Sequence, residues 1–276
     1  MPEVWAGRLG EMQIASTSGG TALTTTAGYI EFPALTKAGD SRQCHVTVTP
    51  RNFATAVVAK VTFNPWLTVL KTTDSMAAPP TDYSIYAQDS STGTSVDLSS
   101  LGTVANGDWV LVGSHNRFRG AYCDVDSTNS TASVTLTVEY WNGDAWVSAS
   151  ATNGTSSATA FDQDGLVYWT VPGAWVAAKF TDIYPVVSGL PANQYYSNEK
   201  MYWTRWSVDV ALDSSVTLDS MVAANRSATY VELLSGQPLE MKTLYGFGGL
   251  GCVEALVNAG TGNLVVNVML NQGSEF

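Results

Sequence analysis

Six residues late in the sequence match a nucleotide-binding pattern. The run Gly246-Phe247-Gly248-Gly249-Leu250-Gly251 is a literal G-x-G-x-x-G, in which the glycines let the backbone approach a pyrophosphate. A dinucleotide site also needs a helix directly after the pattern and an acidic residue about twenty positions further on. The short remainder of the sequence has the pattern of strand, turn and strand, with no carboxylate near position 270. We therefore expect a glycine-rich bend and no cofactor.

Alternating oxygen-bearing side chains suggest a second chemistry, calcium binding. Four of them are spaced like the first ligands of an EF-hand loop, namely Asp124, Asp126, Thr128 and Ser130. Asn129 stands where that loop needs glycine, and Thr135 where it needs a bidentate glutamate. A looser site at Asp124 and Asp126, or at Asp162 and Asp164, would supply two of the roughly six to eight oxygens that calcium takes. We expect solvated turn aspartates and no metal.

The two histidines, His45 and His115, offer little for catalysis. His45 follows Cys44 in the sequence and would lie on the opposite face of any strand, so the pair cannot chelate one metal. Ser114 adjoins His115, but no G-x-S-x-G elbow is present. Paired carboxylates for glycoside hydrolysis depend on spacing in three dimensions, and nothing singles out two of the 24 acidic residues. We expect no catalytic residues and no enzymatic activity.

Aromatic residues gather in three clusters, which could stack on sugars or build a core. The clusters are Tyr140/Trp141/Trp146, Tyr168/Trp169/Trp175 and Tyr202/Trp203/Trp206. Large aromatic rings chiefly build cores and interfaces, and the alternation of the flanking strands directs about half of these rings inward. Five of them are candidate interface or ligand residues: Trp141, Trp146, Trp169, Trp175 and Trp203. A core or subunit interface is the favoured role.

Strands are the elements that must position these side chains. Apolar and polar residues alternate over 57–63, 134–141, 202–212 and 264–270, which is typical of strands with one solvated face. Turn signals separate them, and Asn142-Gly143 predicts a type I′ hairpin turn between Tyr140 and Trp146. Short helical turns are expected only at 172–180 and 218–225. The fold class is therefore all-β.

Composition along the chain suggests how these strands are divided. We expect a β-sandwich or jelly-roll-like central domain at residues 81–222, which holds most of the tryptophans. The boundary before it is placed at Met76-Ala-Ala-Pro-Pro80. Residues 31–80 are expected to pair with 223–276 in a second, discontinuous β-domain. Residues 1–30 have the composition of an N-terminal arm, because 16–26 are almost entirely Ser, Thr and Gly.

Charge and hydrophobicity exclude several classes of protein. The 276 residues include 24 acidic and 13 basic side chains, a formal net charge of −11, and only 13% are charged while 45% are hydrophobic. Such a composition is too hydrophobic for a disordered chain. Thirteen dispersed cations also cannot form a stripe that follows nucleic-acid phosphates. We expect no nucleic-acid partner.

The sequence shows no pattern typical of a targeting signal, a membrane span or a disulfide framework. Residues 1–16 contain no apolar run of signal-peptide length, and no stretch approaches the roughly 18 apolar residues that cross a bilayer. We expect synthesis in a cytoplasm and no membrane partner. Cys44, Cys123 and Cys252 are odd in number and widely spaced, so each is expected to act as a small core hydrophobe.

The middle of the chain resembles a known family. Four motifs occur in order between residues 106 and 221: a YWNG-W hairpin within 134–147, FDQDG at 161–165, YWTVP with Trp175 at 168–175, and MYWTRWSV at 201–208. This combination resembles a β-sandwich module of tailed-bacteriophage virion proteins. The resemblance implies a structural component of a phage particle, with no catalytic residues to carry over.

We therefore expect a virion protein made in the host cytoplasm, in the role of a capsid decoration (cement) protein. Its expected partners are the major capsid protein and copies of itself, with a homotrimer as the first expectation. A tail, baseplate or fibre component is the alternative in the same setting. A carbohydrate-binding β-sandwich module, with a glycan contact at its tryptophans, is the alternative from another class.

Overall fold

The computed structural model describes residues 12–14, 20–32, 35, 37–54, 57–89, 91–102, 104–185, 187, 189–190, 194–225 and 230–270. These residues form three sheets and very little helix, which confirms the expected all-β, sandwich-like fold. The helical elements are short: α1 (Phe180–Ile183) and the 3₁₀ turns η1 (Asp74–Met76), η2 (Tyr86–Gln88), η3 (Ser99–Gly102) and η4 (Val104–Asn106). None of the helices in this part of the chain has the length and apolar character to cross a membrane.

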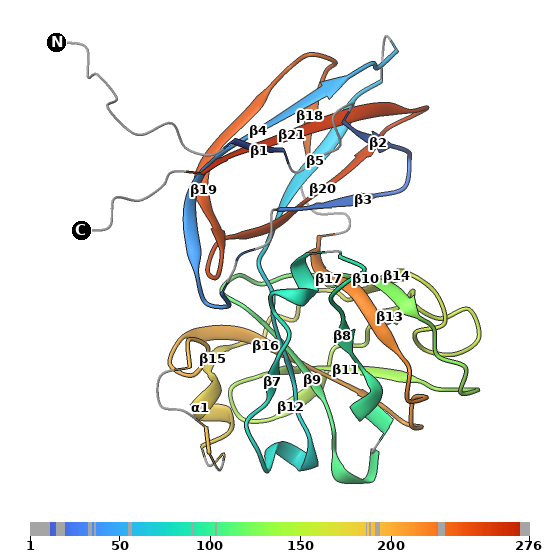
Figure 1. The fold of residues 1–276 in the computed structure, drawn as a ribbon, viewed down its shortest axis with the longest axis vertical. Coiled ribbons are helices and arrows are strands. Elements are labelled where there is room, and N and C mark those ends of the chain that lie inside the picture. Colours follow the sequence, from blue (N-terminus) through green and yellow to red (C-terminus); the bar gives the residue numbers. More distant parts are fainter. Residues whose placement is uncertain are drawn as a thin grey trace, which may run out of the picture.

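Nine strands from both ends of the described chain build one unit, the chain-end sandwich (Figure 1). The nine are β1 (Met12–Ile14), β2 (Thr21–Leu23), β3 (Gly28–Glu31), β4 (Ser41–Arg51), β5 (Ala59–Pro65), β18 (Val231–Leu233), β19 (Leu239–Gly246), β20 (Leu250–Val257) and β21 (Gly262–Leu270). β4 pairs with β19 and β21, while β5 pairs with β18 and β20. Strands more than 150 residues apart in sequence are therefore neighbours in space.

The chain-end sandwich has two layers around one core. β19 and β20 share a single residue pair, Tyr245 with Leu250, so the hydrogen-bonded ladder folds over at this point. The alternation of β4 turns Val46 and Val48 inward, where they join one apolar cluster with Val61 of β5 and Val253 of β20. Branched side chains at every second position pack well between two pleated layers, and this explains why these segments form strands.

The remaining strands form the middle sandwich, which has a five-stranded and a seven-stranded sheet (Figure 1). The five are β8 (Val96–Asp97), β10 (Gly120–Ser127), β13 (Thr152–Asn153), β14 (Gly165–Tyr168) and β17 (Thr217–Ala224). The seven are β6 (Thr68–Lys71), β7 (Thr81–Asp82), β9 (Val110–Ser114), β11 (Leu136–Trp141), β12 (Trp146–Ser148), β15 (Ala177–Lys179) and β16 (Lys200–Val208). Their facing sides enclose a core that includes Val112, Phe118, Trp175 and Trp206.

The chain enters the middle sandwich earlier than residue 80. Trp66 packs in the core of the chain-end sandwich, whereas Leu67 packs in the core of the middle sandwich. β6 and β7, which flank the Pro79-Pro80 connector, both belong to the seven-stranded sheet. The proline-rich segment is therefore a loop inside the middle sandwich, and the crossing lies between Trp66 and Leu67.

Part of the expected N-terminal arm belongs to the chain-end sandwich. β2 pairs with β21 and β3 pairs with β20, and Leu23 and Ile30 are buried in the core. β1 also pairs with β21. The rest of that arm, residues 1–11 and 15–19, lies outside the described residues.

The two expected helical turns are not found where the sequence suggested them. α1 begins at Phe180, at the end of the first range. The second range is strand β17, whose last five residues are all buried. One face of β17 packs in the middle core, and the other meets β5 and β20 of the chain-end sandwich. Burial on both faces removes the apolar–polar alternation that would have marked a strand.

A buried carboxylate, Glu254 on β20, lies where the two sandwiches meet. Its side chain has no solvent exposure. Asn64 Nδ2 and the backbone N–H of Asn225 donate to Oε2 at 2.8 and 2.7 Å, and the Tyr230 hydroxyl donates to Oε1 at 2.6 Å. Asn64 precedes the first crossing of the chain, while Asn225 and Tyr230 flank the second. One side chain thus joins both crossings.

Replacing Glu254 tests how much this junction contributes to stability. We expect Glu254→Leu to lower the free energy of unfolding by about 2–4 kcal/mol, because buried donors lose their acceptor. Glu254→Gln, which keeps an acceptor oxygen, should lose less. Urea unfolding followed by tryptophan fluorescence gives the comparison, with Glu240→Gln at an exposed position as the control. Equal stability of Glu254→Leu and this control would contradict the role given to Glu254.

Candidate functional site

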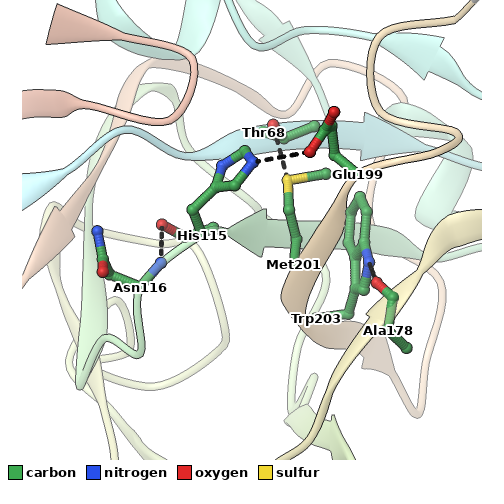
Figure 2. Close-up of polar contacts among 8 residues, drawn as sticks. Thr68, His115, Asn116, Ala178, Glu199, Met201 and Trp203 are labelled. Atoms are coloured by element: carbon green, nitrogen blue, oxygen red, sulfur yellow. Dashed lines mark hydrogen bonds and ion pairs between the residues drawn. The ribbon is translucent and has the colours of Figure 1, made fainter. Parts of the chain in front are cut away.

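The histidines lie in different units and face different partners. His45 is on the outer side of β4, with Nε2 3.4 Å from Glu240 Oε2. His115 directly follows β9 and points toward Glu199, with Nε2 3.9 Å from Oε2 (Figure 2). The neighbouring Ser114 hydroxyl accepts the backbone N–H of Asn116 at 3.4 Å. Neither histidine is thus arranged as a base beside a nucleophile.

Side chains around His115 are engaged in packing. The Thr68 hydroxyl donates to Met201 Sδ at 3.7 Å, and the Trp203 indole N–H donates to the Ala178 carbonyl at 3.1 Å (Figure 2). Met201 and Trp203 are both buried on the outer side of the seven-stranded sheet, under α1. This face is a second apolar core and offers no open cleft among these residues.

Several of the aspartates considered for calcium lie near one another. The Val125 N–H donates to Asp164 Oδ1 at 2.9 Å. Burial, followed by the charges of Asp164 and Asp219, raises the pKa of Asp124. Burial, followed by the charges of Asp126 and Asp164, raises the pKa of Asp219. Within the described chain, however, no three His, Cys, Asp or Glu side chains are arranged to hold a metal ion.

The glycine-rich run is a tight turn between β19 and β20. Gly246 and Gly248 have φ values of +91° and +78°, which glycine adopts without strain. A Cβ on Gly249 would meet the backbone of Leu244. The glycines therefore serve close backbone packing, and a strand follows the pattern where a nucleotide site needs a helix.

Three of the five candidate tryptophans are core residues. Trp169, Trp175 and Trp203 are each at most 4% exposed. Trp175 donates its indole N–H to the Trp203 carbonyl at 3.1 Å and packs edge-on against Trp169. These rings cannot reach a ligand, and their role is to fill the middle sandwich. The three cysteines are likewise free and buried.

Trp141 and Trp146 are half-buried on the β11–β12 hairpin. They form a cross-strand pair with ring centroids 5.4 Å apart at 67°. The turn between them differs from the expected type I′, because Gly143 has a positive φ (+104°) and Asn142 does not. The Asn142 carboxamide oxygen instead accepts the backbone N–H groups of Asp144 and Ala145, which holds the turn by a side-chain contact.

Trp146 belongs to a stacked column that the sequence did not reveal. The Arg205 guanidinium lies between the rings of Trp109 and Trp146, at 4.6 and 5.0 Å from their centroids. Arg205 Nε and an Nη both donate to Glu139 Oε2, at 2.8 and 2.7 Å. Tyr184 stacks on Trp109 and also interacts with Arg205 and Trp146. The column therefore connects the hairpin to other elements of the sandwich, while Trp141 packs edge-on against Trp146 outside the stack.

A hollow on the described surface lies over the outer face of β4, β19 and β21. It has a volume of about 910 Å³ and is lined by Gln43, Cys44, His45, Lys242, Thr243, Leu244 and Met269. Leu244 and Met269 are 40% and 43% exposed. Burial raises the pKa of the Cys44 thiol to about 11, so it is protonated and weakly nucleophilic at neutral pH. The hollow thus combines exposed apolar side chains with His45, Lys242 and a protonated thiol.

Sequence reasoning missed the residues of this outer face. The alternation of β19 places Glu240, Lys242 and Leu244 outward, and Met269 on β21 pairs with His45 on β4. The sequence signal for this face was Leu244, an apolar residue among the polar residues that point outward from β19. Its significance depends on how β19 is aligned with β4 and β21, which cannot be derived from a single sequence.

The described residues form an all-β protein of two sandwiches, with a hollow over the outer face of β4, β19 and β21. Searches against protein-family models, curated proteins and solved structures find no match.

Arg205 provides a test of the stacked column. We expect Arg205→Lys to lower the free energy of unfolding by about 1–3 kcal/mol, because lysine keeps the charge and loses both the planar stacking and the forked contact with Glu139. Lys60→Gln is the control, since its 3.7 Å contact with Glu232 is exposed and should change stability by less than about 0.5 kcal/mol. Urea unfolding compares the two. Equal effects would show that the column does not support the hairpin.

Proposed function

We propose that the protein is a structural component of a tailed-phage particle, a capsid decoration protein that binds and stabilises the head lattice. The observation that carries this proposal is where the side chains with reactive or ligand-binding potential lie. The histidines are apart, the cysteines are buried, and most candidate tryptophans fill the core. We therefore place the function of the protein on its exposed surface. The resemblance of residues 106–221 to virion sandwich modules supports the phage setting.

The outer face of β4, β19 and β21 is the proposed lattice contact. It combines the exposed side chains of Leu244 and Met269 with the neutral Gln43 and the charged or titratable Lys242 and His45. The apolar side chains favour burial against a partner, whose surface would have to supply hydrogen-bond or ionic partners for the charged groups. Lattice sites related by symmetry favour a homo-oligomer, and a trimer remains the proposed state.

Two exposed apolar residues test this docking face. Leu244→Asp and Met269→Asp should each weaken binding to purified phage heads that lack the protein by about tenfold or more, because a carboxylate would be buried against the lattice. Val210→Asp is the matched control, since Val210 is 43% exposed on the other sandwich. Co-sedimentation with heads measures the affinity. Equal loss in all three variants, or in none, would reject this face.

Copy number separates head decoration from the other virion roles. Quantitative mass spectrometry of purified particles should find the chain at a high copy number, comparable to a repeating lattice site. Detection at a handful of copies would reject decoration and point to the tail or baseplate.

Glycan binding is a second candidate because Trp141, which packs edge-on against Trp146, is only half-buried. Sugars pack against aromatic faces, and one accessible ring supports only weak binding. If the protein binds glycans, Trp141→Ala should abolish the signal on a glycan array, while Tyr86→Ala, at a ring 43% exposed elsewhere, should retain it. Absence of any array signal for the wild type would remove this candidate.

A further inference from the structure

The β19–β20 turn inserts an aromatic ring from the chain-end sandwich into the middle sandwich. The Phe247 ring meets His115 edge-on, with centroids 4.6 Å apart at 80°. It meets Tyr195 in the same way, at 4.7 Å and 83°. The Phe247 N–H donates to the Asp40 carbonyl at 3.0 Å, so the turn is fixed within its own unit. We call His115 and Tyr195 the Phe247 socket.

The Tyr195 side of the socket contacts both sandwiches. Its hydroxyl lies 2.9 Å from the hydroxyl of Ser84 in the middle sandwich, and that hydroxyl donates to Asp82 Oδ1 at 2.6 Å. The Tyr195 ring also packs against Gly39 of the chain-end sandwich, where a Cβ would lie 2.5 Å from ring carbon Cγ. Tyr195 is therefore bound to the middle sandwich through its hydroxyl and contacts the chain-end sandwich at Gly39 and Phe247.

The His115 side of the socket can change its charge. Its side chain is only 27% exposed, and Glu199, the charged group that acts on it, is 57% exposed and 3.9 Å away. Burial lowers the pKa of His115 and outweighs the opposing effect of Glu199. The other groups near the imidazole are neutral near pH 7: the Phe247 ring, which in turn contacts the Tyr195 ring, and the two chain neighbours of His115, Ser114 and Asn116.

We propose that Phe247 locks the two sandwiches together and that protonation of His115 releases it, so that the junction loosens on acidification. Phe247 covers His115, and withdrawal of the ring returns the imidazole to water. The closed junction thus favours neutral His115. Its contribution to stability is fully present above the ordinary pKa of 6.5 and is lost as the pH falls below that value. This device does not depend on the proposed virion role.

Carboxylates elsewhere at the junction respond in the opposite sense. Burial, followed by the charge of Asp124, raises the pKa of Glu31, so Glu31 on β3 and Asp124 on β10 repel each other across the junction. A raised carboxyl pKa means that the closed state gains stability as the pH falls through it. Substitution at His115 separates the two effects because it leaves this pair unchanged.

The experiment uses the full chain with one spin label on each sandwich, at Val231→Cys and Val104→Cys. Both positions are exposed, and the native cysteines are buried. Pulsed electron paramagnetic resonance then measures the distribution of distances between the two labels at pH values from 7.5 to 5. The wild type should give a narrow distribution at pH 7.5 that broadens below about pH 6.5. His115→Gln should stay narrow throughout, and Phe247→Ala should be broad throughout.

Two further variants make the test specific. Glu199→Gln should move the midpoint of broadening to lower pH, because Glu199 favours the protonated imidazole. His45→Gln, at the other histidine of the chain, should keep the wild-type response. A wild-type distribution that does not change with pH, or equal broadening in His115→Gln and wild type, would overturn the proposal.

Discussion

A carboxylate without access to water must be surrounded by hydrogen-bond donors. For Glu254 these donors come from segments far apart in the sequence. Its three donors come from β5 and from the two ends of the segment that links β17 to β18. Asn64 also donates to the Ala223 carbonyl of β17 at 2.7 Å. These bonds can form only when the outer face of β20 lies against β17. These bonds therefore help to fix the relative position of the sandwiches.

The same junction explains how the two units differ in composition. The chain-end core is built mainly from valine and other aliphatic residues, whereas the middle core holds Trp169, Trp175 and Trp206, which pack edge-on. Aromatic rings also fill the second core of the middle sandwich under α1, where Phe180, Tyr196 and Trp203 pack edge-on. Although the chain has few charged residues, it can bury polar groups at this junction because their hydrogen-bond partners come from the protein itself. The outer faces of the two sandwiches are not needed to hold the junction together.

Alternation was a reliable guide where one face of a strand meets solvent, as in β11 and β21. It failed for β17, whose two faces are both buried, and it gave no sign of the crossing between Trp66 and Leu67, two neighbouring apolar residues that pack in different cores. Pro79-Pro80 was misleading because prolines mark loops inside a unit as well as linkers. The hairpin tryptophans were recognised, but their partner Trp109 comes from another element. Contacts made by distant segments, such as the Phe247 socket and the Leu244–Met269 face, depend on register and could not be derived from local pattern.

Pairing of β4 with β19 and β21 also sets an order for folding during synthesis. β4 and β5 leave the ribosome about 170 residues or more before their main partners, and contacts of such long sequence separation form slowly. All strands of the middle sandwich are complete by Ala224, before β18 to β21 are made. The middle sandwich can therefore fold first and hold β5 next to the site where β20 will add. A nascent chain would carry the unpaired strands β4 and β5 during this interval, and their protection from premature association depends on how quickly residues 231–270 are translated.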